Sequence, residues 1–356
     1  MKVSRSRLLE ILTAAMPGSG SASLSVIETP GADPQTVWIP ATVGEPAFLA
    51  YSITKTFTAS LVLKLCDQGK LHLADALVNW FPRLPQVSHV TLYQLLNHTA
   101  GIPDYGGIAA YHDAVRLSPS EPWSPQRFAT ETFERGLLFR PGTGWAYSNV
   151  GYMLLKQILE RVSGVGYGTL VAELIARPLG LTRTYVAESI ADLSELAPSF
   201  SSRLAADGSL RDVRACYHPG WVSHGVVAAT TSDIVRFIDS LFAGRLLSAD
   251  SLGRMLELVP LPAVVDQSAS GESPLRPRRP GYGLGVMGDP ESPWGTLVGH
   301  NGGGPGYGAS ALHAVDLGSV SVCAMGSMEE GFDAVSVIAQ VLDDYLSRSY
   351  SGDSNP

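Results

Sequence analysis

The chain has 356 residues, 45% of them apolar, and a net charge of −8 at neutral pH. A chain of this length and composition can bury a large core, which excludes global disorder and fits one large domain or two intergrown lobes. The acidic balance, with no run of five basic residues, argues against nucleic acid or an anionic membrane as a partner.

The cysteines and the N-terminal residues bear on the cellular compartment of the protein. Cys66, Cys216 and Cys323 lie far apart without a CxxC spacing, which favours free thiols and a reducing environment. The apolar stretch at residues 8–16 contains Glu10 and fits an amphipathic helix better than a secretion signal. No apolar run approaches the ~18 residues of a membrane helix. We therefore expect a cytoplasmic protein; a periplasmic or secreted location is the alternative.

The first third of the chain predicts a hairpin and a buried helix. Residues 23–28 and 36–40 form two strand-like runs around a turn-forming segment. Residues 52–67 have helical apolar spacing with almost no polar face, and Gly69 follows as a stop signal.

The middle of the chain predicts a mostly helical lobe. Residues 70–204 contain many proline breaks, and their clearest helical patterns lie at 151–162 and 167–175.

The C-terminal part of the chain is predicted to contain strands and two helices. An N-cap cluster at 231–233 opens a helix that Gly244 closes, and the Pro- and Arg-rich residues 259–281 predict an exposed loop. A helix at 332–346 follows four predicted strands, at 283–286, 296–300, 309–315 and 320–325.

This pattern indicates an α+β fold, an antiparallel sheet flanked by helices with a mostly helical lobe added. We expect residues 1–69 and 205–356 to form the α/β-sheet domain and residues 70–204 the helical domain, with the active site at their interface.

The first candidate catalytic residues are Ser52 and Lys55, at the start of the predicted buried helix. Residues three apart lie on nearly the same helix face, and helical side chains lean toward the N-terminus, so the amine reaches the hydroxyl. Serine needs a neighbouring base to attack a carbonyl, and burial lowers the pKa of a lysine. Taken alone, the pair also fits an N-cap serine followed by a solvent-reaching lysine.

Two further segments carry polar groups or glycines where a substrate can approach. Tyr147 and Asn149 follow a Pro-Gly turn, and residues 299–307 read Gly-His-Asn-Gly-Gly-Gly-Pro-Gly-Tyr. Glycines allow close approach of another backbone. An ordinary half-buried tyrosine and a glycine-rich turn between strands are the structural alternatives.

Together the three segments resemble the serine β-lactamases and penicillin-binding proteins. The branch with a Tyr-x-Asn second motif and a His-x-Gly third motif is the class C β-lactamase-like group. It includes D-alanyl-D-alanine peptidases, D-amino-acid amidases and family VIII carboxylesterases. The stretches 95–102, Leu-Leu-Asn-His-Thr-Ala-Gly-Ile, and 177–181, Arg-Pro-Leu-Gly-Leu, are also similar to this family, so the likeness covers about residues 20–345.

The resemblance implies the roles of the site residues. Ser52 forms an acyl-enzyme, and Lys55 and Tyr147 share the proton transfers, without an assignment of which is the base. The backbone N–H groups of Ser52 and Gly303 are the expected oxyanion hole. His98 matches a family-marker position and is interpreted as structural. The expected substrate-binding residues are Asn149, His300, Asn301, Gly302 and Tyr307.

His300 stands where β-lactamases have a lysine. A largely neutral histidine weakens the case for penicillin hydrolysis, so the sequence favours a carboxylesterase acting on small or medium acyl esters. A D-amino-acid amidase or peptidase, a β-lactamase, and a sensor that acylates without turnover are the alternatives. The partner is a small-molecule ester or amide. No His-x-x-x-His spacing, carboxylate cluster, Gly-x-Ser-x-Gly elbow or phosphate loop occurs, so we expect neither a metal nor a cofactor.

Overall fold

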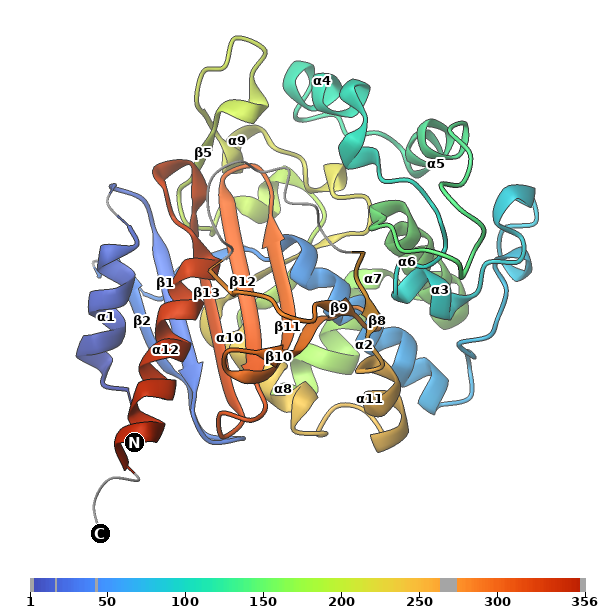
Figure 1. The fold of residues 1–356 in the computed structure, drawn as a ribbon. Coiled ribbons are helices and arrows are strands. Elements are labelled where there is room, and N and C mark those ends of the chain that lie inside the picture. Colours follow the sequence, from blue (N-terminus) through green and yellow to red (C-terminus); the bar gives the residue numbers. More distant parts are fainter. Residues whose placement is uncertain (1–2, 17, 42–43, 263–273, 353–356) are drawn as a thin grey trace.

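The computed structural model describes residues 3–16, 18–41, 44–262 and 274–352. An eight-stranded antiparallel sheet with the order β2-β1-β13-β12-β11-β10-β9-β8 forms its centre (Figure 1). Its strands are β1 (Ala22–Ile27), β2 (Gln35–Ile39), β8 (Val259–Pro260), β9 (Gly281–Tyr282), β10 (Met287–Ser292), β11 (Gly295–Gly303), β12 (Tyr307–Ala314) and β13 (Val320–Ser327). The predicted β1–β2 hairpin and the three last predicted strands are confirmed.

One strand prediction is wrong. Residues 283–286 form the turn between β9 and β10, because Gly285 has a φ of +74° and Gly283 packs against the backbone of Met255. The predicted loop at 259–281 contains β8 at its start, and its residues 263–273 lie outside the described part of the chain.

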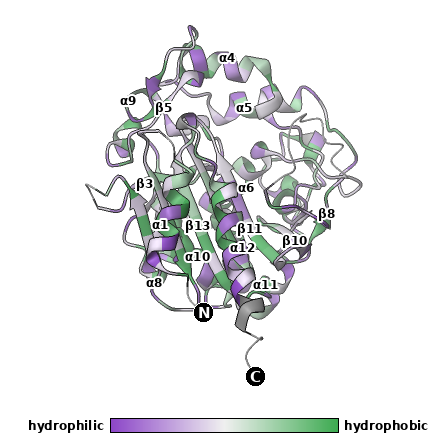
Figure 2. Cartoon of the chain, turned by 60° about the vertical axis from the view of Figure 1, so that its left-hand side comes forward, coloured by the Kyte–Doolittle hydropathy of each residue, from purple (hydrophilic) through white to green (hydrophobic). Residues whose placement is uncertain are grey.

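Helices cover both faces of the sheet. Helices α1 (Arg5–Ala14) and α12 (Ala334–Gly352) pack on one face, and α10 (Thr231–Phe242) packs on the other against β1 and β13. Figure 2 shows the central strands mostly in the hydrophobic colour and the outer helices in mixed colours, as expected for helices with one apolar face. The α+β fold class is therefore confirmed.

A second sheet of three short strands was not predicted. It has the order β3-β7-β4, with β3 (Ala47–Leu49), β7 (Val226–Thr230) and β4 (Thr184–Ala187). Strand β7 is buried along its whole length, so it lacks the alternation by which a half-exposed strand is recognised. A two-stranded sheet joins β5 (Phe200–Ser201) to β6 (Arg211–Asp212).

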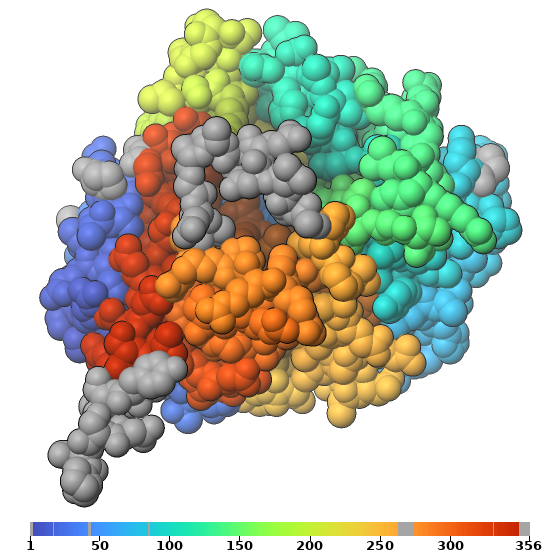
Figure 3. Space-filling view, in the orientation of Figure 1, coloured from blue at the N-terminus to red at the C-terminus, as the bar shows by residue number. Residues whose placement is uncertain are grey.

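The middle of the chain is helical, and Figure 3 shows its cyan and green segments on one side of the molecule, with the blue, orange and red segments on the other. The remaining helices are α2 (Thr54–Asp67), α3 (Leu92–Leu96), α4 (Ala109–Leu117), α5 (Pro125–Phe133), α6 (Asn149–Ser163), α7 (Tyr167–Val171), α8 (Arg177–Leu179), α9 (Val213–Cys216) and α11 (Ala249–Met255). The division into two domains stays a prediction.

Two further observations bear on the expected environment. The three cysteines are free thiols, with Cys323 buried and the other two partly buried. Among the described residues, no helix has the length and apolar character needed to cross a membrane.

Candidate active site

Ser52 lies in the short 3₁₀ turn Tyr51–Ile53 that leads directly into α2. Tyr51 has a φ of +45°, a left-handed conformation that costs a non-glycine residue ~1–3 kcal/mol. Such strain persists where the surroundings fix it, and here it precedes the proposed nucleophile. Ser52 itself is only partly buried.

Two proton carriers meet at this hydroxyl. The Tyr147 hydroxyl donates to Ser52 Oγ at 2.9 Å, and Lys55 Nζ lies 3.3 Å from the same oxygen. Tyr147 comes from the segment just before α6, 95 residues along the chain. The structure therefore brings the three expected reacting groups together within hydrogen-bonding distance.

Lys55 is completely buried in the first turn of α2. Burial lowers its pKa to about 7, because the charged form loses its hydration, and the nearby carboxylate of Asp104 opposes this shift. A large fraction of this amine is therefore neutral at physiological pH and able to accept a proton.

Asn149 is oriented by Asp104, which the sequence analysis missed. Asp104 accepts hydrogen bonds from Asn149 Nδ2 at 3.0 Å and from Asn149 N at 2.9 Å. A carboxylate only accepts, so the amide nitrogen faces Asp104 and Oδ1 faces Lys55, whose Nζ donates to it at 2.6 Å. Asn149, which the sequence analysis expected to bind substrate, thus contacts the Lys55 amine directly.

His224 is a second neighbour of the Lys55 amine, and it was not predicted from the sequence. Its Nε2 atom lies 2.8 Å from Lys55 Nζ, and its ring is almost fully buried just before β7. A single histidine ahead of an apolar run matches no catalytic motif, so only the fold reveals this contact.

His98 holds the segment that carries Tyr147. Its Nδ1 atom accepts from Ser148 N at 3.2 Å, and its carbonyl oxygen accepts from Ala146 N at 3.0 Å. The structural interpretation of His98 is confirmed by these two bonds.

Burial raises the pKa of Tyr147 above its ordinary range, against the opposing hydrogen bond to Ser52, so this phenol stays protonated.

The third segment approaches Ser52 through its glycines. A Cβ atom at Gly302 would lie 2.2 Å from the Ala50 carbonyl oxygen and 3.1 Å from Ser52 N, so β11 touches the nucleophile turn only because this residue is glycine. Gly303 is exposed, and a Cβ there would meet nothing within 4 Å. Its surroundings thus leave room for a substrate, as a backbone oxyanion donor requires.

The other residues expected to bind substrate differ in exposure. His300 is buried, and its Nδ1 atom bonds the carbonyl oxygen of Asn301. Because a carbonyl oxygen only accepts, Nδ1 carries the proton of the neutral ring. The Nε2 atom therefore accepts from the Tyr282 hydroxyl at 2.9 Å. Burial lowers the pKa of His300 to about 3, with the same effect from the charge of Lys55. Asn301 accepts from Ser310 Oγ at 2.7 Å.

Tyr307 is fully buried and packs edge-on against Phe48. Its hydroxyl donates to the Ala197 carbonyl oxygen at 2.6 Å. This environment is that of a core residue, so we leave Tyr307 out of the substrate site proposed below. Within the described ranges, no group of three or more His, Cys, Asp or Glu side chains is placed to hold a metal ion.

Comparisons with known proteins place the chain in a family. A family model described as Beta-lactamase matches residues 37–343. Penicillin-binding protein 4* of Bacillus subtilis (strain 168) is 30% identical over 288 residues, 74% of this chain and 57% of that protein. D-alanyl-D-alanine-carboxypeptidase/endopeptidase AmpH of Escherichia coli (strain K12) is 33% identical over 138 residues, 37% of this chain and 35% of that protein. The chain thus matches about half or less of the length of these relatives.

Solved structures resemble the whole chain. A D-stereospecific amidohydrolase from Streptomyces sp. has a TM-score of 0.78 and 28% identity, covering 94% of this chain and 98% of its own. The D-amino acid amidase from Ochrobactrum anthropi SV3, complexed with D-phenylalanine, has a TM-score of 0.76 at 21% identity over 97% of this chain and 99% of its own, and supports the fold alone. The extent of the family match shows that this chain belongs to the Beta-lactamase family, the serine hydrolases that include the penicillin-binding proteins.

Proposed function

We propose that this protein hydrolyses small acyl compounds through an acyl-enzyme on Ser52, with amides as the main substrates. The observation that carries this proposal is the meeting of Lys55 Nζ and the Tyr147 hydroxyl at Ser52 Oγ, at 3.3 and 2.9 Å. These distances suit proton transfer in the free enzyme, where catalytic hydrogen bonds are often longer than in complexes.

Lys55 acts as the general base in this proposal. Its neutral amine takes the Ser52 hydroxyl proton while Oγ bonds to the substrate carbonyl carbon, which places negative charge on the carbonyl oxygen. The N–H groups of Ser52 and Gly303 stabilise that oxyanion. As the bond to the leaving group breaks, the Tyr147 hydroxyl protonates the departing amine and takes up the proton held by Lys55. Water then attacks the acyl-enzyme, with the same groups transferring its proton in reverse order.

The protonated phenol favours amides over esters. An amine leaves from a tetrahedral intermediate only when it is protonated, whereas a phenolate or a stabilised alkoxide leaves without help. Tyr147 supplies that proton next to Ser52. Similarity to the D-stereospecific amidohydrolase and to a D-aminopeptidase of Gluconobacter oxydans, 28% identical over 54% of this chain, supports the same choice.

A carboxylesterase of the family VIII type is the second candidate. It is supported by His300, which is neutral because its pKa lies near 3 and which therefore provides no cation for the carboxylate of a β-lactam.

Three substrates separate these activities. Butyryl p-nitroanilide and p-nitrophenyl butyrate share one acyl group and differ in the leaving group, and nitrocefin is a β-lactam. We expect anilide cleavage that is lost in Ser52→Ala, with a rate enhancement over spontaneous hydrolysis larger than that for the ester. Ester cleavage alone would favour the second candidate. Preferred turnover of nitrocefin would contradict both, and an adduct that persists without turnover would indicate a sensor.

A further inference from the structure

A cavity of about 560 Å³ lies beside the proposed oxyanion donor. Gly303, Gly304 and Pro305 form one wall, α4 forms a second, and the 3₁₀ turn Ser202–Leu204 with the residues after it forms a third. A substrate with its carbonyl carbon at Ser52 and its carbonyl oxygen at Gly303 therefore has room to extend into this cavity. We infer that the cavity binds a carboxylate on the acyl part of the substrate. This inference rests on the proposed function.

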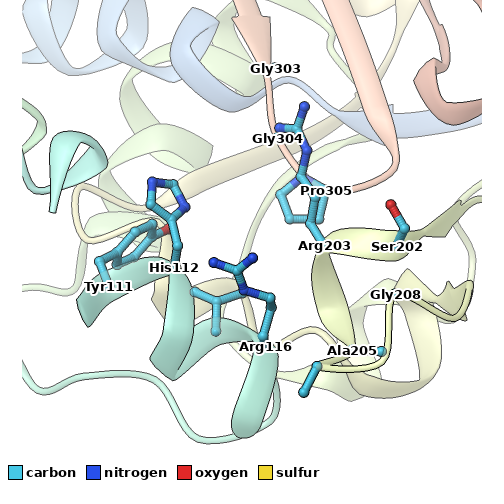
Figure 4. A pocket seen from close by; sticks show the side chains of 12 residues that line it. Tyr111, His112, Arg116, Ser202, Arg203, Ala205, Gly208, Gly303, Gly304 and Pro305 are labelled. Atoms are coloured by element: carbon cyan, nitrogen blue, oxygen red, sulfur yellow. The ribbon is translucent and has the colours of Figure 1, made fainter. Parts of the chain in front are cut away.

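The cavity has a positive lining. Arg116, from α4, and Arg203, from the 3₁₀ turn, both line it, and Figure 4 shows the guanidinium group of Arg203 beside Gly304 and Pro305. None of the residues that line it is Asp or Glu. Each guanidinium group offers paired N–H donors of the kind that a carboxylate accepts.

Both arginines are available to a ligand. Arg203 forms no ion pair among the described residues. Arg116 pairs with Asp113 at 3.2 Å, but these side chains are 44% and 64% exposed, and such surface pairs contribute little and exchange readily.

Arg203 also acts electrostatically on the nucleophile turn. Burial raises the pKa of Tyr51, and the charge of Arg203 opposes that shift. The Tyr51 hydroxyl bonds the Pro305 carbonyl oxygen, so this positive charge acts at the wall of the cavity that Pro305 forms. His300 is neutral at the third motif, and among the described residues that line the cavity the arginines carry the positive charge. They also disfavour substrates with a free ammonium group in the acyl part.

The test uses three acyl groups of similar size and different charge: succinyl, butyryl and 4-aminobutyryl. Each is joined to whichever leaving group, p-nitroaniline or p-nitrophenol, the wild type releases. We expect kcat/KM to rank succinyl above butyryl above 4-aminobutyryl, with the preference weakening as salt is added. Arg203→Ala should lower succinyl turnover about 10-fold or more relative to butyryl turnover, so that the preference for succinyl is reduced. Arg127→Ala, which removes an exposed arginine of α5, is the matched control.

A binding measurement separates this inference from the proposed function. Ser52→Ala and Ser52→Ala/Arg203→Ala are titrated with succinyl p-nitroanilide by calorimetry, which needs no turnover. Weaker binding in the double variant supports the cavity even if the catalytic proposal fails. Equal affinity in both variants, or equal loss of succinyl and butyryl turnover in Arg203→Ala, would overturn the inference.

A separate contact carries a second inference: we propose that His224 is a positioning residue that directs the lone pair of Lys55 toward Ser52. A neutral amine has two N–H donors and one lone pair. We assign His224 the tautomer with its proton on Nδ1, in which Nε2 accepts from Lys55 Nζ at 2.8 Å. Asn149 Oδ1 lies at 2.6 Å from the same nitrogen, and Ser52 Oγ lies farther away at 3.3 Å. When the two donors are used on the near acceptors, the lone pair faces the hydroxyl that it must deprotonate.

The protonation of His224 fits this role. Burial lowers the pKa of its ring well below the ordinary range, and the charge of Lys55 acts in the same direction, so the ring is neutral. Its Nδ1 atom is buried without a hydrogen-bond partner among the described residues, so Lys55 is the polar neighbour that holds the ring. The other titratable groups around the amine are Tyr147, Tyr152, His98, His300 and, through Asn149, Asp104.

Two substitutions test the role of His224. His224→Leu keeps an apolar volume but removes the acceptor, and His224→Gln places an amide oxygen near the former Nε2 position. We expect His224→Leu to lower kcat up to about 10-fold, the size of effect from losing a hydrogen bond between neutral groups, with little change in KM. Its pH–activity inflection should move to lower pH, because the ammonium form loses an acceptor. His224→Gln should restore part of kcat and the inflection.

The matched control is His72→Leu, at an exposed histidine beyond the end of α2. An inflection that stays in place or moves to higher pH in His224→Leu would contradict the positioning role. A shift to higher pH would indicate instead that the substitution loosens the site, because water that enters stabilises the charged form of Lys55. An inactive His224→Gln variant that remains folded by circular dichroism would contradict it as well.

Discussion

The hydroxyl group of Tyr51 donates a 2.6 Å hydrogen bond to the carbonyl oxygen of Pro305. The same ring lies beneath Gly304, where a Cβ atom would approach a ring carbon to 2.3 Å. The residue before the nucleophile and the turn after the proposed oxyanion donor are therefore held by one side chain. This contact explains how the left-handed backbone at Tyr51 is maintained.

Tyr51→Phe should separate these two segments. The loss of one hydrogen bond costs ~0.5–1.5 kcal/mol of unfolding free energy, measurable by denaturant titration. We expect kcat to fall several-fold with a smaller change in KM, because the oxyanion donor is displaced relative to Ser52. Unchanged kcat in a destabilised variant would show that the turn holds its position without this bond.

Gly302→Ala should reduce activity more severely. The added Cβ would lie 2.2 Å from the Ala50 carbonyl oxygen, so β11 has to move away from the nucleophile turn. Loss of one oxyanion donor typically lowers the rate about 10²–10³-fold, and we expect a kcat loss approaching that range. Gly253→Ala, on α11 with open space at its Cβ, is the control, and similar activity in both variants would contradict the close approach.

The pH dependence of kcat/KM should follow Lys55. Its pKa is lowered to about 7 by burial, so the amine is protonated and inactive as a base below that pH. We expect activity to rise with pH through an inflection near 7 and then to level off. A flat profile between pH 5 and 9 for a substrate limited by chemistry would exclude Lys55 as the base.

Asp104→Asn should shift this inflection to lower pH. The Asp104 carboxylate favours the charged form of Lys55, so its removal makes the amine harder to protonate. The plateau rate should also fall, because an asparagine no longer dictates which way the Asn149 amide faces. Asp250→Asn, an equal charge change on the exposed start of α11, should leave both quantities as in the wild type. A shift of the Asp104→Asn inflection to higher pH would contradict this electrostatic account.

Tyr147→Phe distinguishes the two proton carriers. Its phenol stays protonated because burial raises its pKa, and we assign it the protonation of the leaving amine. The variant should therefore lose anilide turnover about 10²-fold or more, in line with general acid catalysis, and retain much more of its activity on p-nitrophenyl butyrate. Equal losses on both substrates would indicate that Tyr147 acts before the leaving group departs.

The sequence predicted the parts of the site that local geometry sets. The spacing of Ser52 and Lys55 fixes their contact once α2 forms, and the amphipathic helices and long strands of the sheet follow from apolar periodicity. By contrast, Asp104 and His224 reach Lys55 only through tertiary packing, and neither stands in a recognisable pattern. Strand β7 escaped prediction for a related reason: complete burial removes the alternation that marks a strand.

The exposure of individual side chains could not be predicted from the sequence either. Tyr307 closes a glycine-rich motif that suggests a substrate site, but its ring packs inside the core against Phe48. Arg116 and Arg203 are separated by 87 positions and are ordinary surface residues by sequence; only the placement of α4 opposite the 202–204 turn brings them to one cavity.

The central claim is that Ser52 carries the acyl group, and trapping the intermediate tests it most directly. The wild type is mixed with p-nitrophenyl butyrate, quenched in acid within milliseconds to seconds, digested, and analysed by mass spectrometry. We predict a butyryl group on the peptide that contains Ser52, formed at the rate of the p-nitrophenol burst and absent in Ser52→Ala. Turnover that continues in Ser52→Ala, or an acyl group found on a different residue, would contradict the account.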